Sequence, residues 1–173
     1  GCAWVKQIRH VLLWLVALLS NGPSLQRHYL LSVYKGQGDN VEMCLGASPW
    51  GLGGTLTVNG NLVAYFSDPL QEADIDQLEL EVGSCKCQQA VEALAALVAL
   101  RLWSARWLQN GAILRVKGDN VSALVLVVRL KTSGNAMNLI AREMALDIAA
   151  ACYAPHVATH IPGVTNVACD GLS

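Results

Sequence analysis

Three β-type runs lie between residues 41 and 66 of the chain. Val41 to Ala47 leads into a glycine-rich turn, and Thr55 to Val58 then meets Asn59-Gly60. This dipeptide tolerates the positive φ angles of a tight hairpin turn, so we expect the chain to return through Asn61 to Phe66. The pattern predicts three consecutive antiparallel strands.

The second half of the chain alternates helical and extended patterns. Gln88 to Trp107 has the broad apolar coverage of a helix that packs on a sheet. The order predicts an α/β fold, with a mixed five-stranded sheet of three antiparallel strands and then crossover strands, flanked by helices. The remaining elements are expected as strands at Ala112 to Lys117 and His156 to Ile161, and as helices at Val121 to Leu130, Ala136 to Tyr153 and Asn166 to Ser173, the last cut short by the end of the chain.

Two segments lie outside this alternation of strands and helices. Ser67 to Gly83 carries six acidic residues, and we expect a loop with a solvated acidic surface. Val11 to Leu19 is an apolar run of nine residues, shorter than the roughly 20 that span a membrane. We expect a buried helix that leads into the domain, with a signal or membrane anchor as the alternative.

Composition limits the classes of partner. The chain has 173 residues, which allows one domain and an appendage. Its 53% apolar and 14% charged residues are consistent with an apolar docking face, and the net charge of −1 gives no global attraction to nucleic acid. Trp103 and Trp107, four residues apart, fit core packing better than base stacking. Local phosphate contacts would have to come from basic residues, and ordinary surface solubility is the favoured alternative role for them. The candidates are Arg101, Arg106, Arg115, Lys117, Arg129 and Lys131.

Six scattered cysteines do not form a dense disulfide framework, and reduced, partly buried thiols are expected. A zinc site from Cys85, Cys87, His156 and His160 is the weaker alternative, because no second close cysteine pair supports it.

Four motifs follow one another in a specific order. Ala47-Ser48-x-x-Gly51-x-Gly53-Gly54 follows the first strand, and an Ala/Leu-rich helix carries Glu92. Asp119-Asn120 ends a later strand, and His160-Ile-Pro-Gly-x-x-Asn166-x-x-Cys-Asp170-Gly-Leu-Ser closes the chain. In this order, residues 41–173 resemble the ribonuclease H domain of retroelement reverse transcriptase polyproteins. Residues 1–40 would then be the tail of the preceding reverse transcriptase or connection segment, and the chain a piece of a longer polypeptide.

The resemblance implies a ribonuclease H-like fold and a set of residue roles. Glu92, Asp119 and Asp170 would be the metal ligands and catalytic carboxylates, and His160 would assist proton transfer or product release. Ser48, Asn120 and Asn166 would contact the substrate. Family members hydrolyse the RNA strand of RNA–DNA hybrids with two Mg²⁺ ions, and carboxylate oxygens are the ligands that Mg²⁺ prefers.

Gly46 departs from the family pattern. The first catalytic Asp, which bridges both metal ions in the family, is expected where this chain has Gly46. Glu42 lies four residues earlier, about 13 Å away along a strand, and cannot replace it. We therefore expect the fold to persist with reduced or lost endonuclease activity, and Gly46→Asp to raise that activity.

The resemblance also names partners. These are an RNA–DNA hybrid and the adjoining reverse transcriptase domain, with no membrane, in the cytoplasm or nucleus. The alternative function is a non-catalytic module that supports the polymerase and holds the hybrid.

Overall fold

The computed structural model describes residues 5–20, 38–106, 112–150 and 155–173. One five-stranded sheet has the order β3-β2-β1-β4-β5. β1 pairs antiparallel with β2 and parallel with β4, β2 pairs antiparallel with β3, and β4 pairs parallel with β5. The predicted mixed sheet is therefore confirmed. The strands are β1 (Asp39–Ala47), β2 (Gly51–Val58), β3 (Asn61–Pro69), β4 (Ala112–Gly118) and β5 (Pro155–His160).

The hairpin between β2 and β3 turns where the sequence predicts. Asn59 and Gly60 have φ angles of 50° and 86°, the two positive values that a two-residue hairpin turn of this hand requires. A bulge between Leu56 and Thr57 interrupts the pairing with β3.

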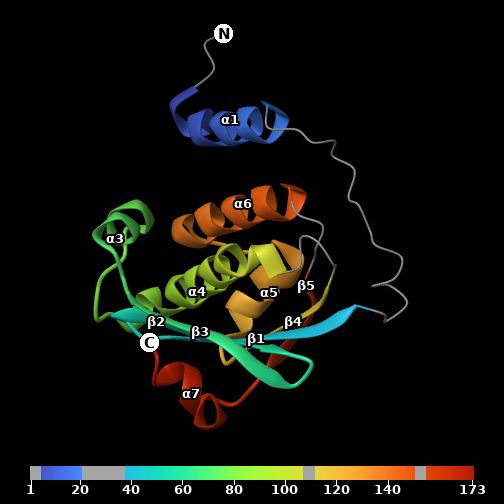
Figure 1. Ribbon diagram of the computed structural model, residues 1–173. Helices are drawn as coiled ribbons and strands as arrows, with labels where there is room; N and C mark the ends of the chain where they lie inside the picture. Colours follow the sequence, from blue (N-terminus) through green and yellow to red (C-terminus); the bar gives the residue numbers. More distant parts are fainter. Residues whose placement is uncertain (1–4, 21–37, 107–111, 151–154) are drawn as a thin grey trace.

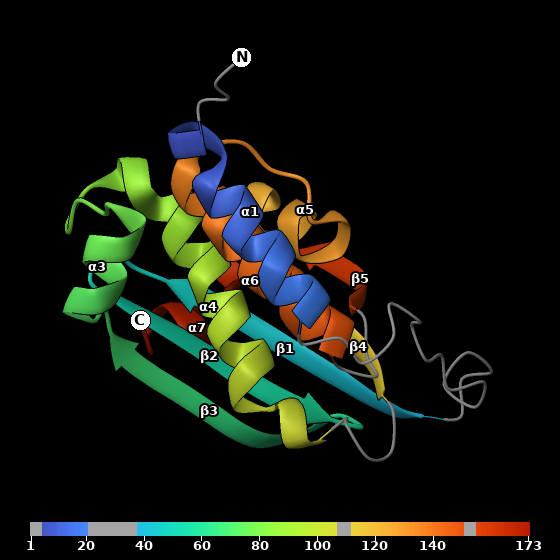
Figure 2. The ribbon, with the colours of Figure 1, turned by 90° about the horizontal axis from the view of Figure 1, so that it is seen from above.

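Helices cover the two faces of the sheet unequally (Figure 1). α4 (Gln88–Leu102) and α5 (Val121–Arg129) lie on one face, and α6 (Asn135–Ala150) packs on the outside of both. α7 (Val167–Asp170) lies alone on the opposite face against β1 and β2. Figure 2, which views the molecule from above, shows that α4 crosses β1 and β2. Fully buried side chains fill the space between α4, α5 and the sheet, including Met43, Leu56, Leu100, Leu114 and Leu126.

The N-terminal helix corrects one prediction. α1 (Val5–Ser20) lies over α6, and Trp14 Nε1 donates a hydrogen bond to the Arg142 carbonyl at 3.0 Å. The predicted burial of this helix is wrong, because Leu13, Val16 and Leu19 are 56–67% exposed. Residues 11–19 of the helix are all apolar, so one contact line on α6 leaves apolar side chains uncovered on its other sides. No helix in the described residues is long and apolar enough to span a membrane.

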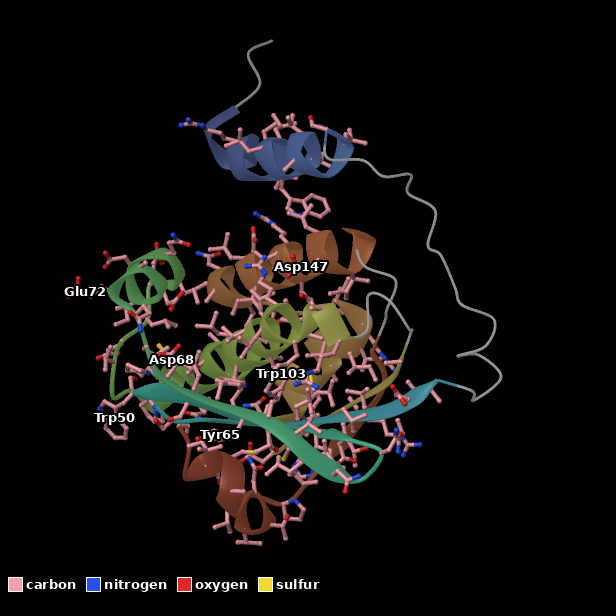
Figure 3. All side chains as sticks on the ribbon, viewed as in Figure 1. Trp50, Tyr65, Asp68, Glu72, Trp103 and Asp147 are labelled. Atoms are coloured by element: carbon pink, nitrogen blue, oxygen red, sulfur yellow. The ribbon has the colours of Figure 1, made fainter. Side chains whose placement is uncertain are left out.

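The segment predicted as an acidic loop contains a helix. β3 continues to Pro69, and α3 (Glu72–Leu78) follows it. Glu72 and Asp74 lie in the first turn of α3, where acidic side chains stabilise the positive end of the helix dipole. Asp68 and Glu72 are exposed (Figure 3), as expected for a solvated acidic surface.

Helix α4 ends earlier than predicted. The helix ends at Leu102, and Trp103 (labelled in Figure 3) is its C-cap residue. Trp103 is 5% exposed and packs edge-on against Phe66, with ring centroids 5.6 Å apart. The packing role of Trp103 is confirmed, and Trp107 lies outside the described residues. The α6 boundary predicted at Tyr153 also lies outside them, as does most of the connector before β1.

Candidate functional site

Three predicted carboxylates lie at one edge of the sheet. Glu92 is in the second turn of α4, Asp119 directly follows β4, and Asp170 is the last residue of α7. β1 and β4 are parallel neighbours, so Gly46 near the end of β1 lies at the same edge.

The charges of these carboxylates act on one another. Burial, and then the Asp119 charge, raise the pKa of Glu92 to about 8. Burial, and then the Asp119 charge, also raise the pKa of Asp170. Like charges in a common site disfavour ionisation, so Glu92 retains a proton near neutral pH unless a cation compensates.

Glu92 is fixed by an amide on its own helix. It is 5% exposed, and Gln88, one turn earlier, donates from Nε2 to Glu92 Oε1 at 3.1 Å. The same nitrogen donates to the Ala47 carbonyl at 2.6 Å, so it ties Glu92 to the end of β1. The hydrogen bond from Gln88 to Glu92 favours the charged carboxylate and partly opposes the rise that burial causes in the pKa of Glu92.

Asp170 is fixed in the same way. Asn166, one turn earlier and 2% exposed, donates from Nδ2 to Asp170 Oδ1 at 2.9 Å and to the Leu45 carbonyl at 3.0 Å. Asn166 Oδ1 accepts from the Cys44 thiol at 3.2 Å. All its side-chain polar atoms therefore have internal partners, which gives Asn166 a structural role, and the substrate contact predicted for it stays a prediction.

Asp119 differs from the other two carboxylates. Its Oδ1 is buried and accepts no hydrogen bond while the neighbouring acids are ionised, whereas a protonated Glu92 donates a hydrogen bond to the Asp119 side chain. An unsatisfied buried carboxylate oxygen costs free energy and is the kind of atom that a proton or a cation satisfies.

Gly46 decides whether the family's metal pair fits. The buried Asp119 oxygen and the repulsion between the Asp119 and Glu92 carboxylates would both be relieved by a cation. Gly46, however, has no side chain that could act as a ligand. An ideal Cβ at residue 46 would lie 2.9 Å from Asp170 Oδ1 and 2.8 Å from the backbone carbon of Cys169. The described part of the chain holds no group of three His, Cys, Asp or Glu placed to bind a metal ion. The site as it stands does not fit the two-metal centre.

The remaining predicted site residues lie near this edge. Ser48 Oγ accepts hydrogen bonds from the backbone of Trp50 and Gly51, and so shapes the turn after β1. Asn120 Oδ1 accepts from the backbone of Ser122 and Ala123 and caps α5. Exposed His160 ends β5 opposite Gly118. The roles predicted for Ser48, Asn120 and His160 stay predictions.

Two of the candidate phosphate contacts are engaged elsewhere. Arg101 pairs with Glu143 at 2.7 Å and with Asp147 at 2.6 Å, and Lys117 pairs with Glu42 at 2.8 Å. The latter pair also shows that Glu42 faces a lysine rather than the carboxylates. Arg101 and Lys117 are therefore poor candidates for phosphate binding.

Arg129 and Lys131 instead line an open groove of about 430 Å³. Its other lining residues come from the start of α4 (Gln89), from α5, and from Thr132 and Ser133 after α5. The starts of α4 and α5 are also where Glu92 and Asp119 lie, so the groove extends away from the acidic edge.

Gln88 is the site residue that sequence reasoning missed. Its signal was present, because an amide and a carboxylate four residues apart on a helix are neighbours. The sequence pattern could not reveal the second hydrogen bond of Gln88, which goes to the Ala47 carbonyl in a strand 41 residues away.

The fold has known counterparts among solved structures. LC11-RNase H1 in complex with an RNA/DNA hybrid matches with a TM-score of 0.59 and 17% identity, over 78% of this chain and 92% of that chain. RNase H1 from the halophilic archaeon Halobacterium salinarum NRC-1 matches with a TM-score of 0.53 and 15% identity, over the same shares. A foamy viral protease-reverse transcriptase in complex with dsDNA reaches a TM-score of only 0.38 and carries no argument.

Comparisons of sequence find no counterpart. No family model matches the chain, and no curated protein matches it. The strand order, the helix placement and the two structural neighbours agree with one another. The chain therefore has the ribonuclease H-like fold.

Proposed function

We propose that this chain is the ribonuclease H-like domain of a retroelement polyprotein, which binds RNA–DNA hybrid and has lost most or all of its hydrolytic activity. The observation that carries the proposal is Gly46, which lies beside three carboxylates from separate elements but contributes no ligand. Hydrolysis by the family chemistry requires that ligand, whereas hybrid binding does not.

The carboxylate edge supports descent from a hydrolase. Glu92 is buried and Asp170 is exposed, and both carboxylates repel Asp119 and are each held by an amide. Such an arrangement lowers stability and is unusual unless it serves, or once served, chemistry. An ancestral two-metal nuclease accounts for it.

The groove along α5 supports retained binding. Arg129 and Lys131 line it together with the hydroxyl residues Ser122, Thr132 and Ser133. Cationic and hydroxyl side chains are the groups that contact phosphate oxygens in nucleic acid complexes. A hybrid whose RNA strand lies at the carboxylate edge would place a phosphate chain along this groove.

The sequence motifs, rather than the fold, support placement in a retroelement polyprotein. The closing run from His160 to Ser173 carries the Pro-Gly-x-x-Asn and Asp-x-Leu-Ser spacing on which the resemblance rests. Residues 1–40 would follow a reverse transcriptase domain. Reading the coding sequence that precedes Gly1 tests this part, because an in-frame reverse transcriptase is expected there.

Binding is tested by fluorescence anisotropy with labelled 20-base-pair duplexes of identical sequence: RNA–DNA hybrid, DNA and RNA. We expect the hybrid to bind more tightly than either homoduplex, since its groove geometry differs from both. Equal affinity for all three would indicate only non-specific charge attraction, and absence of binding would contradict the proposal.

A further inference from the structure

Three glycines line the strip of sheet under α7. Gly46 on β1 pairs directly with Gly53 on β2, and Gly51 lies two residues earlier on the same face of β2. Alternate residues of a strand share a face, so the three leave this strip of sheet without side chains. We call Gly46, Gly51 and Gly53 the glycine seat.

The backbone of the C-terminal segment occupies the space that side chains on this strip would fill. A Cβ at Gly46 would lie 2.8 Å and 2.9 Å from the carbonyl carbon and oxygen of Cys169. A Cβ at Gly53 would lie 2.7 Å from that same oxygen and 2.7 Å from Leu172 Cβ, and one at Gly51 would lie 3.2 Å from the carbonyl carbon of Ser173. Contacts below 3.0 Å with backbone atoms are not relieved by rotating a side chain, so the segment itself would have to move.

Contacts on both sides of the seat hold the segment in place. Asn166 bonds the Leu45 carbonyl and the Cys44 thiol on β1, and Ser67 Oγ on β3 donates to the Leu172 carbonyl. Cys169 is 1% exposed and contacts Thr55 Oγ1 on β2 at 3.8 Å. The segment is therefore bound to three strands and not merely adjacent to one.

We propose that α7 packs on the glycine seat and fills the position of the missing first carboxylate, so that residue 46 cannot carry an acid unless α7 is released. Gly46 is then a packing residue on which the present fold depends. The loss of the first ligand is not a defect that one substitution repairs. This inference concerns packing and does not rest on nucleic acid binding.

Hydrogen exchange on the unmodified chain gives a first test. The amides of Cys169, Asp170, Gly171 and Leu172 are bonded only within the segment itself. A helix of four residues is unstable alone, so their protection depends on docking to the sheet. We expect exchange at least about 100-fold slower than in an unstructured peptide. Exchange at the unstructured rate would overturn the proposal.

Matched glycine substitutions give a second test. Gly118 also lies in a strand, but a Cβ there meets ordinary contacts at 3.7 Å and 3.8 Å. We expect Gly46→Ala and Gly53→Ala to lower the melting temperature by about 5 °C or more, and Gly118→Ala to change it by less than about 2 °C. Equal melting temperatures for Gly46→Ala and the parent would overturn the proposal.

A double-mutant cycle with Asn166 distinguishes the seat from a general effect of bulk. Asn166→Ala weakens the same docking, so Gly46→Ala should cost less in that background than in the parent. Strictly additive losses would contradict a shared docking event. Failure of Gly46→Ala to fold leaves hydrogen exchange on the parent to decide. None of these measurements involves a hybrid, so their outcome is separate from that of the proposed function.

Discussion

The side-chain amides of Gln88 and Asn166 donate hydrogen bonds to the two backbone carbonyls that flank Gly46, and they do so from opposite faces of the sheet. Gln88 reaches Ala47 from α4, and Asn166 reaches Leu45 from α7. Each amide also holds the carboxylate four residues later, Glu92 or Asp170. One end of β1 thus sets the positions of two of the three site acids.

Asn166→Ala should destabilise the domain. The substitution leaves the buried Leu45 carbonyl without its side-chain donor and removes a bond to a carboxylate, which together cost about 2–3 kcal/mol. For a domain of this size that corresponds to a fall of about 5–10 °C in melting temperature. Asn138→Ala, at an exposed position on α6, is the matched control and should change stability little. Equal behaviour of the two variants would show that Asn166 does not hold α7.

Stability should fall as the pH rises from about 4.5 to about 8. The pKa of Glu92 is raised from 4.5 in the unfolded chain to about 8 in the fold, so in this window the folded state holds a proton that the unfolded state has lost. The unfolding free energy therefore decreases with increasing pH, by up to a few kcal/mol. The raised pKa of Asp170 acts in the same direction.

Glu92→Gln isolates this effect, because glutamine keeps the shape and does not titrate. Urea unfolding at pH 5, 6, 7 and 8 should show a flatter profile for Glu92→Gln than for the parent, with the largest gain in stability at pH 8. Glu72→Gln replaces an exposed acid and should leave the profile unchanged. An unaltered profile in Glu92→Gln would contradict the assigned burial and charge effects.

Arg129 and Lys131 should contribute to hybrid binding through phosphate contacts. Replacing either with Gln should weaken binding to hybrids of any sequence and reduce the slope of log K against log salt concentration by about 1. Arg142→Gln is the matched control, because Arg142 lies on α6 and does not line this groove. A slope that changes equally for all three variants would place the hybrid elsewhere.

Gly46→Asp should not restore cleavage. From the sequence alone, returning an acid to this position was expected to raise activity. The glycine seat reverses that expectation, because the new side chain would meet the backbone of Cys169. We expect a less stable protein that cuts hybrid no faster than the parent. Cleavage by Gly46→Asp that requires Asp119 would show that α7 yields easily and would contradict the seat.

Much of the fold could be predicted because its signals are local. The Asn59-Gly60 turn and the apolar helix around Glu92 each identify an element from a few neighbouring residues. The exposed state of α1 could not be predicted, since its apolar pattern is the same whether a partner covers it or not. The early end of α4 at Trp103 likewise depends on packing against Phe66, a strand residue distant in sequence.

The sequence proposed the members of the candidate site but did not reveal their packing. Resemblance identified Glu92, Asp119, Asp170 and the missing acid at Gly46, and the structure brings their elements to one edge. Asn166 was assigned to substrate, because its motif position does not reveal that it is 2% exposed. The glycine seat depends on contacts across more than 100 residues of sequence, which no local pattern contains.

The most direct measurement is a cleavage assay on end-labelled RNA–DNA hybrid with excess protein, in Mg²⁺ and separately in Mn²⁺, with binding followed on the same samples. Asp119→Asn serves as the control for contaminating nuclease. We expect the unmodified chain to bind the hybrid and to leave the RNA strand intact, at the level of Asp119→Asn, with either metal. Cleavage by the unmodified chain that disappears in Asp119→Asn would contradict the proposed loss of activity and show that another group completes the site.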